Sequence, residues 1–332
     1  MKIEELHRLR LCTLPTPLME APQLSAKLGG PRILIKRDDL TGLAMGGNKS
    51  RPLEFLMTGA KDMGADVIIT AGYEQSNWVC NQLAAARKLG MDVILFLVKG
   101  NRRFQGNLLL YKLLGAEIKF TDIEISDLPV LYKQMDDMAA ELRSQGRRPY
   151  VVYYEAVGLL GIASYVLLAS EIRKQLQEKE ITAQYLFLTS GSGCTQAGLI
   201  LDAKYFKAPF KVVGVMPNHR YSREQRVQMI TDYANETAKF LDMNLTFKSE
   251  EINYYDEYAG ENYSGPTKKG IEATKFLAGT EGIFLDPLYT SKSMACLIDQ
   301  VQDGRIGRED TVVYYHSGGL PIIFAHNEEL IA

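Results

Sequence analysis

The stretch YLFLTSGSGCTQAGLILDAKY, residues 185–205, contains one complete passage from a strand to a helix. Its first four residues are apolar and predict a buried strand, a glycine-rich turn follows, and residues 195–205 carry a helical pattern. A second strand is predicted over residues 211–216. A strand, a helix and a strand in this order predict parallel strands joined by a right-handed crossover. Such a sheet needs helices on both faces.

The same alternation runs through most of the chain. Strands are also predicted over residues 33–36, 67–70, 93–98, 118–120, 150–153 and 311–315. Helices are predicted over residues 53–63, 78–89, 107–114, 128–144, 160–176, 267–278 and 291–301, with a final short helix from Pro321. The predicted fold class is therefore α/β, with open, mostly parallel twisted sheets covered by helices.

The composition argues against several classes of protein. The chain has 332 residues, more than one compact core usually holds, so two domains are expected. Lysine and arginine total 38 against 40 acidic residues, which argues against a nucleic-acid-binding surface. The longest apolar run, residues 93–98, is too short to cross a membrane. Four scattered cysteines and four dispersed histidines predict neither disulfides nor a metal site, and the cytoplasm is the expected location.

Four glycine-containing junctions between strands and helices could hold a ligand, because ligands bind beyond the carboxyl ends of parallel strands. They are GGNK (46–49), AGYEQSN (71–77), TSGSGCT (189–195) and HSGG (316–319). The third is best suited to a phosphate, since glycine N–H groups and the start of a helix attract an anion. Ser190, Ser192 and Thr195 can add hydroxyl groups. For a single glycine loop, a tight turn without a ligand is an equal alternative.

Lys49 is the candidate nucleophile. It follows two glycines and Asn48 directly and opens a predicted helix. A helix start and the neighbouring Arg51 both disfavour an ammonium group, so the pKa of Lys49 is expected to fall. A phosphate site and an activated lysine together are what pyridoxal phosphate requires, with one anchor for the phosphate and one amine for the aldehyde carbon.

Five segments of the chain occur in a characteristic order: GGNK (46–49), QSN (75–77), SGSGCTQAG (190–198), LDPLYT (285–290) and HSGG (316–319). Together they resemble the signature of the D-cysteine desulfhydrase and 1-aminocyclopropane-1-carboxylate deaminase family. These are pyridoxal phosphate enzymes of the tryptophan synthase β-subunit type. The resemblance extends from residue 14 to residue 325.

The resemblance implies a role for each matching residue. Lys49 would form the Schiff base with the cofactor and later move the α-proton, and Asn77 would hydrogen-bond the cofactor's 3′-oxygen. Ser76 would contact the substrate carboxylate or assist proton or nucleophile chemistry. Tyr289 and Tyr263 match two active-site tyrosines, although Tyr263 could instead be an ordinary loop aromatic. The phosphate would lie in the loop formed by Ser190, Gly191, Ser192, Gly193, Cys194 and Thr195.

The resemblance also implies an architecture of two open, mostly parallel sheets with the cofactor between them. A large domain would comprise residues 1–48 and 160–332, and a small domain residues 49–159. The implied partners are a small amino-acid substrate and a second copy of the chain in a homodimer.

Thr290 bears on the reaction. A carboxylate beside the ring nitrogen of the cofactor keeps that nitrogen protonated, whereas a hydroxyl group leaves it largely neutral. Ring-opening deaminases of the family carry Glu after the tyrosine, but this chain has Thr290, with Ser317 as a second hydroxyl group. β-Elimination is therefore predicted, with D-cysteine giving pyruvate, sulfide and ammonia. The alternatives are 1-aminocyclopropane-1-carboxylate deamination and a lyase with a sulfonate or amine leaving group.

Three departures from the family pattern bear on the identity of the substrate more than on the binding of the cofactor. EAVG (155–158) replaces a Gly-Gly-Ser-Asn stretch, so Glu155 could reshape the substrate pocket or face solvent. Trp78 follows Asn77 where relatives have a smaller polar residue, and Cys194 replaces a glycine. A protein that binds the cofactor without turnover is a further alternative.

Overall fold

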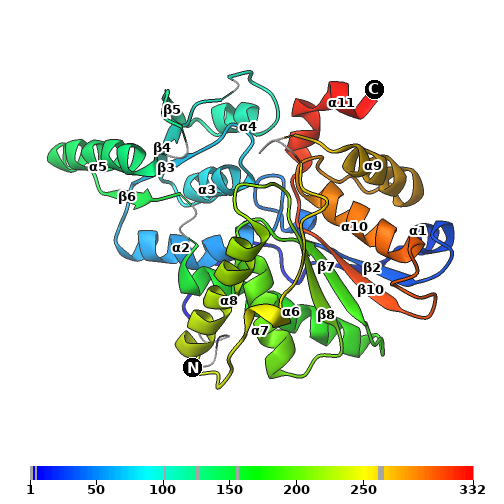
Figure 1. Cartoon of the computed structure of the whole chain (residues 1–332). Helices are drawn as coiled ribbons and strands as arrows, with labels where there is room; N and C mark the ends of the chain where they lie inside the picture. Colours follow the sequence, from blue (N-terminus) through cyan, green and yellow to red (C-terminus); the bar gives the residue numbers. More distant parts are fainter. Residues whose placement is uncertain are drawn as a thin grey trace.

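Two β-sheets lie side by side, each with helices on both faces (Figure 1). The computed structural model describes residue 3 and residues 6–100, 102–124, 127–154, 157–260 and 265–331. The chain builds two strands of the larger sheet, then the whole smaller sheet, and returns to complete the larger one. The predicted fold class is confirmed. Within the described ranges, no helix combines the length and the apolar composition needed to cross a membrane.

The larger sheet has six strands in the order β1–β2–β10–β7–β8–β9. Neighbouring strands run parallel, except that β1 is antiparallel to β2. Because side chains alternate along a strand, Leu34 and Val313 enter one core whereas Ile33 and Val312 enter another. The strands span Leu18–Glu20 (β1), Arg32–Arg37 (β2), Thr311–His316 (β10), Tyr185–Thr189 (β7), Lys211–Val215 (β8) and Asn253–Tyr255 (β9).

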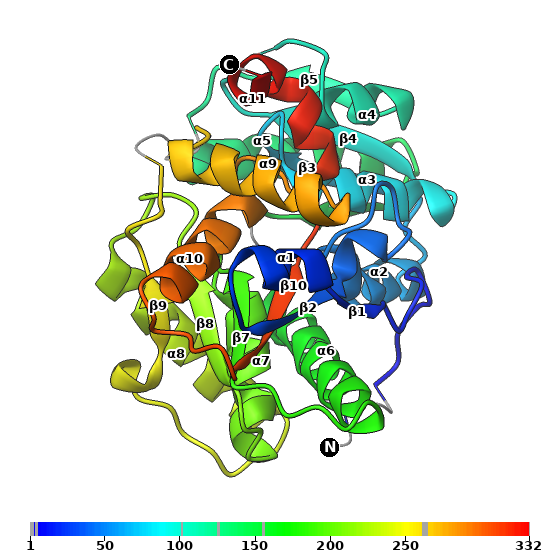
Figure 2. The ribbon, with the colours of Figure 1, turned by 90° about the vertical axis from the view of Figure 1, so that its right-hand side faces the viewer.

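Helices cover both faces of this sheet. One core includes residues of α6 (Gly158–Glu178), α7 (Cys194–Tyr205) and α8 (Arg223–Phe240). The other includes residues of α1 (Pro22–Lys27), α9 (Lys268–Glu281) and α10 (Thr290–Gln302). Figure 2 shows α1 in front of β2 and β10.

The smaller sheet has four parallel strands in the order β5–β4–β3–β6. They span Glu117–Phe120 (β5), Asp92–Leu97 (β4), Val67–Gly72 (β3) and Pro149–Val152 (β6). Helix α5 (Leu128–Ser144) covers one face with its own apolar core. The other face contacts α3 (Asn77–Lys88) and belongs to a core that also includes α4 (Asn107–Leu113).

Helix α2 (Ser50–Asp62) joins the two sheets, because it packs against both α3 and α6. Leu53 and Met57 of α2 share one continuous apolar core with Ile162 of α6 and with Leu186 of the larger sheet. The start of α2, directly after Lys49, is therefore held by the larger sheet as well as by the smaller one.

A buried ionic cluster fixes this junction. The Arg51 guanidinium donates to both carboxylate oxygens of Asp38, at 2.6 and 2.8 Å, and to Glu171 on α6 at 3.0 Å. Tyr315 donates to the same Asp38 carboxylate at 2.6 Å, and Lys36 pairs with Glu171. Burial opposes ionisation of Asp38, but Arg51 and the hydrogen-bond donors outweigh it and lower the pKa of that carboxyl.

Several elements differ from the sequence-based expectation. The short helix predicted from Pro321 is present as the 3-10 helix η4 (Leu320–Ala325), and a short α-helix, α11 (Asn327–Ile331), follows it. The pattern also missed β1, α1, α8 and β9 and two further 3-10 turns, η2 (Asp38–Leu40) and η3 (Ser249–Glu251). The strands of the smaller sheet all fall within residues 67–152, but the domain boundaries at residues 48/49 and 159/160 remain a prediction.

Candidate active site

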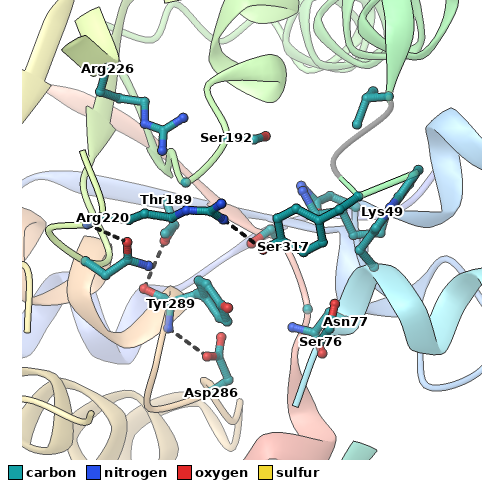
Figure 3. A pocket seen from close by; sticks show the side chains of 17 residues that line it. Lys49, Ser76, Asn77, Thr189, Ser192, Arg220, Arg226, Asp286, Tyr289 and Ser317 are labelled. Atoms are coloured by element: carbon teal, nitrogen blue, oxygen red, sulfur yellow. Dashed lines mark hydrogen bonds between the residues drawn. The ribbon is translucent and has the colours of Figure 1, made fainter. Parts of the chain in front are cut away.

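One cavity lies where the carboxyl ends of strands from both sheets meet (Figure 3). It brings together residues that are far apart in the sequence and come from all four glycine-containing junctions. The sequence-predicted residues that line it are Lys49, Ser76, Asn77, Gly191, Ser192, Tyr289 and Ser317.

Lys49 stands at the start of α2, after a turn that only glycine accommodates easily. Gly47 has φ +117° and Gly318 has φ +94°, and a Cβ on Gly318 would lie 2.5 Å from the Cα of Gly47. The Asn48 N–H donates to the Ser317 carbonyl at 2.9 Å, and the Asn48 side chain donates to the Thr195 hydroxyl at 3.1 Å. The lysine turn is thus tied to two of the other junctions.

Arg51 is engaged away from the cavity. Its guanidinium is bound by Asp38 and Glu171, and it is not among the residues that line the cavity. The two carboxylates therefore balance the charge of Arg51.

The loop after β7 presents the start of α7 to the cavity. Gly193 is the N-cap of the helix, with φ +88°, and as a glycine it provides no capping side chain. Gly191 and Ser192 line the cavity, whereas the other predicted residues of the loop, Ser190, Gly193, Cys194 and Thr195, are not among its lining residues. Among the described residues, the buried Ser190 hydroxyl has no hydrogen-bond partner.

Ser76 and Asn77 are held by the start of α3. The Ser76 hydroxyl accepts from the Val79 N–H at 3.3 Å, and the Tyr111 hydroxyl donates to the Ser76 carbonyl at 2.8 Å. The Asn77 side-chain oxygen accepts from Asn107 at 2.8 Å. Trp78 follows and also lines the cavity, with its side chain almost completely buried.

Thr290 is turned away from the cavity. It is completely buried, and its hydroxyl donates to the Asp286 carboxylate at 2.6 Å. That carboxylate also accepts backbone N–H groups of residues 288–290 and lines the cavity, and burial raises its pKa. Of the two predicted hydroxyl groups, Ser317 therefore faces the cavity.

Four residues that the sequence analysis did not select also line the cavity: Tyr154, Asn218, Arg220 and Arg226. Asn218 and Arg220 follow the carboxyl end of β8, which is a position where ligand-binding residues are expected in parallel sheets. No comparable signal marks Arg226, which lies inside α8. Tyr263 and Glu155 lie outside the described residues.

The comparisons with known proteins agree with this geometry. Residues 9–318 match the family described as pyridoxal-phosphate dependent enzyme. The chain belongs to this family. A D-cysteine desulfhydrase of Klebsiella pneumoniae is 37% identical over 329 residues, which cover 97% of each chain.

Solved structures of related enzymes have the same fold as this chain. A crystal structure of a homologue of 1-aminocyclopropane-1-carboxylate deaminase superposes with a TM-score of 0.87 at 32% identity, covering 99% of this chain and 97% of the other. A threonine deaminase of Solanum lycopersicum has a TM-score of 0.65 at 16% identity over 96% of this chain and 83% of its own, and supports the fold alone.

The residues of this pyridoxal-phosphate-dependent enzyme fit its cofactor. The start of α7, which has a glycine at its N-cap, and the buried Ser190 hydroxyl offer donors to a phosphate. Arg226 is next to this loop, since a Cβ on Gly193 would lie 3.8 Å from its Cδ, and the arginine lines the cavity. Lys49 lines the same cavity, so one cofactor can be held at its phosphate and at its aldehyde carbon.

A second, buried lysine supports the loop after β8. Lys292 is completely buried, and its Nζ donates to the Pro217 carbonyl at 2.6 Å and to the Gly265 carbonyl at 3.1 Å. Burial lowers the pKa of Lys292 to about 8. Lys292 therefore holds the backbone immediately before Asn218 and Arg220.

Lys292 is expected to make the stability of the enzyme depend on pH in the alkaline range. The folded protein releases this proton near pH 8, whereas the unfolded chain keeps it up to the ordinary value of 10.5. Stability relative to a Lys292→Met variant should therefore rise between these pH values, by up to about 3 kcal/mol. Chemical denaturation of both proteins across this range measures the difference. Curves that remain parallel would contradict the lowered pKa.

Proposed function

We propose that this enzyme removes a β-substituent from a small amino acid, with D-cysteine as the reference substrate. The observation that carries the proposal is that the Lys49 amine and the anion-binding loop line one cavity, together with Ser76, Asn77 and Tyr289. Cysteine and water would give pyruvate, ammonia and sulfide, with no oxidant required. The name of the Klebsiella relative, D-cysteine desulfhydrase, supports the same chemistry.

Each residue has a proposed task. Pyridoxal phosphate, when bound, supplies the electron-withdrawing group that acidifies the α-carbon of the substrate. The Lys49 amine then moves the α-proton, because it is the only lysine among the described residues that line the cavity. Ser76 and the first N–H groups of α3 would hold the α-carboxylate, and Asn77 the cofactor's 3′-oxygen. Tyr289 and Tyr263 are proposed as the two tyrosines beside the substrate.

The hydroxyl group at the ring nitrogen is proposed to be that of Ser317. Thr290 would act indirectly, through Asp286, since its own hydroxyl is bound to that carboxylate. Asp286 accepts four hydrogen bonds from residues 288–290, which occupy its oxygens at the start of α10. This arrangement favours elimination over the ring-opening reaction, which requires a protonated ring nitrogen.

Ring opening of 1-aminocyclopropane-1-carboxylate is the second candidate, because a neighbouring solved structure is described as a homologue of that deaminase. We further propose a homodimer located in the cytoplasm, with residues 1–48 and 160–332 forming the large domain and residues 49–159 the small one.

Product analysis distinguishes the two reactions. Purified enzyme incubated with D- and L-cysteine should release sulfide and pyruvate in equal amounts from one enantiomer, and no 2-oxobutanoate from 1-aminocyclopropane-1-carboxylate. A Ser76→Ala variant should reduce turnover, whereas a Ser25→Ala variant, which removes a hydroxyl on α1 outside the cavity, should not. Release of 2-oxobutanoate without sulfide would reverse the assignment.

A further inference from the structure

We propose that Arg226 binds the phosphate group of the cofactor and brings a full positive charge to it, in addition to the N–H groups of the glycine loop. The inference concerns the cofactor alone, so it holds for either of the two reactions considered above. Three observations carry it: the Arg226 guanidinium is buried, no carboxylate pairs with it, and its helix packs directly against the loop.

Arg226 is a buried cation without an anionic partner in the protein. The residue is only 5% exposed. Its guanidinium contacts the Tyr221 ring, whose centre lies 4.5 Å away, the Met229 sulfur, at 3.7 Å from Nη1, and the Tyr254 hydroxyl. No carboxylate of the described residues forms an ion pair with it. Removing a charged group from water is unfavourable unless an opposite charge offsets it, so an anion is expected beside this guanidinium.

The other buried arginine of the chain has carboxylate partners. Arg51 and Arg226 are the two arginines that are buried among the described residues. Arg51 is not among the residues that line the cavity, and it pairs with the carboxylates of Asp38 and Glu171. Arg226, in contrast, lines the cavity. The fold therefore neutralises one buried guanidinium with its own side chains, whereas the other faces a space in which an anionic ligand can bind.

Helix α8 brings Arg226 to the glycine loop. Arg226 and Ile230 are four residues apart, so they lie on the same face of α8. This face covers Gly193, because a Cβ on that glycine would lie 2.7 Å from Cγ1 of Ile230 and 3.8 Å from Cδ of Arg226. Gly193 also has φ +88°, so a larger residue would both strain the turn and push α8 away. The glycine thus allows a guanidinium from α8 to approach the start of α7.

The Arg226 side chain points toward the anion-binding side of the cavity. In Figure 3 it extends from α8 into the cavity, beside the loop that carries Ser192. Tyr254 of β9 connects the two, because its hydroxyl donates to the Ser190 carbonyl at 2.7 Å and also interacts with the Arg226 guanidinium. The arginine and the loop therefore have a common support. A planar guanidinium held in this way can present two parallel N–H groups to the oxygens of a phosphate.

The charge of Arg226 has a consequence that distinguishes two forms of the cofactor. The start of a helix contributes about half a positive charge. A phosphate ester carries between about 1.5 and 2 negative charges at pH 7, so the helix alone leaves most of this charge without compensation. Arg226 should therefore increase the affinity for pyridoxal phosphate but not for pyridoxal, which has the same aldehyde and ring and lacks the phosphate.

Titration of the full-length apoenzyme with pyridoxal phosphate and with pyridoxal tests the proposal, with the absorbance of the bound aldehyde as the readout. In Arg226→Met the Kd for pyridoxal phosphate should rise about tenfold to a hundredfold, the effect of losing hydrogen bonds between charged groups. The Kd for pyridoxal should stay within about twofold of the wild type. The apoenzyme of this variant should unfold at the same denaturant concentration as the wild-type apoenzyme or a higher one, because a buried charge without a partner is removed.

Matched variants separate this role from others. Arg226→Lys keeps the charge and should recover part of the affinity for pyridoxal phosphate, whereas Lys239→Met removes an exposed cation from the same helix and should change neither Kd. An unfolded Arg226→Met apoenzyme, or an equal loss of affinity for both aldehydes, would show that Arg226 supports the fold. Unchanged affinity for both aldehydes with a raised KM for the amino acid would place Arg226 at the substrate. Each of these results overturns the proposal.

Discussion

Replacing Lys49 with alanine is expected to lower kcat by about a thousandfold or more, because the side chain is proposed both to anchor the cofactor and to move the α-proton. Lys49 is the only lysine among the described residues that line the cavity, so no neighbouring amine can take its place there. The absorbance band of the enzyme-bound cofactor and its reduction by borohydride report on the anchoring of the cofactor. Pyruvate release reports on the transfer of the α-proton.

Two further variants make the result specific for Lys49. Lys49→Arg retains a positive charge but cannot condense with an aldehyde, and should be as inactive as the alanine variant. Lys61→Ala removes an exposed lysine from the same helix and should leave both readouts unchanged. A borohydride-reducible band that persists in Lys49→Ala would show that another amine holds the cofactor.

Replacing Arg51 with methionine is expected to cost about 4 kcal/mol of unfolding free energy. Asp38 is completely buried, and removing Arg51 would leave its carboxylate without the cation that offsets its desolvation. Burial would then raise the pKa of Asp38, and the turn whose Gly47 N–H donates to the Asp38 carbonyl at 2.8 Å would lose its support. Chemical denaturation measures the loss.

The matched comparison is an exposed ion pair between β1 and β2 of the larger sheet. Arg32 pairs with Glu20 at 2.5 Å, but the two side chains are 50% and 44% exposed, so Arg32→Met should cost less than about 1 kcal/mol of unfolding free energy. Adding Asp38→Asn to Arg51→Met should restore part of the stability, because the uncompensated charge is removed. Equal losses of unfolding free energy in Arg51→Met and Arg32→Met would show that the buried cluster stabilises the protein no more than the exposed ion pair does.

The sequence predicted those features that depend on local patterns. The parallel strands were recognisable because β2, β3, β4, β7, β8 and β10 are apolar runs, and the glycine junctions were recognisable because each directly follows a strand or precedes a helix. The convergence of Lys49 with Gly191 and Ser192 followed from the rule that ligands bind at carboxyl ends of strands, and it was supported by the family resemblance.

Features that depend on tertiary contacts were not predictable in the same way. Helix α8 was missed because Arg226, Thr231 and Thr237, three polar residues, occupy its buried face and obscure the apolar period. Thr290 was expected to face the cofactor, but its local hydrogen bonds with Asp286 determine where its hydroxyl points. Arg220 was missed because its side chain is positioned by a hydrogen bond to Tyr154, which is 66 residues away in the chain.

The hydrogen bonds of Asn48 connect the two proposed attachment points of the cofactor. Because its backbone is tied to Ser317 and its side chain to Thr195, the turn that carries Lys49 keeps a fixed position relative to the anion-binding loop. Ser76, in contrast, belongs to the smaller sheet, on the far side of the cleft. The two proposed attachment points of the coenzyme, Lys49 and the anion-binding loop, therefore depend on contacts made on one side of the cleft, whereas Ser76, the proposed partner of the substrate carboxylate, comes from the other side.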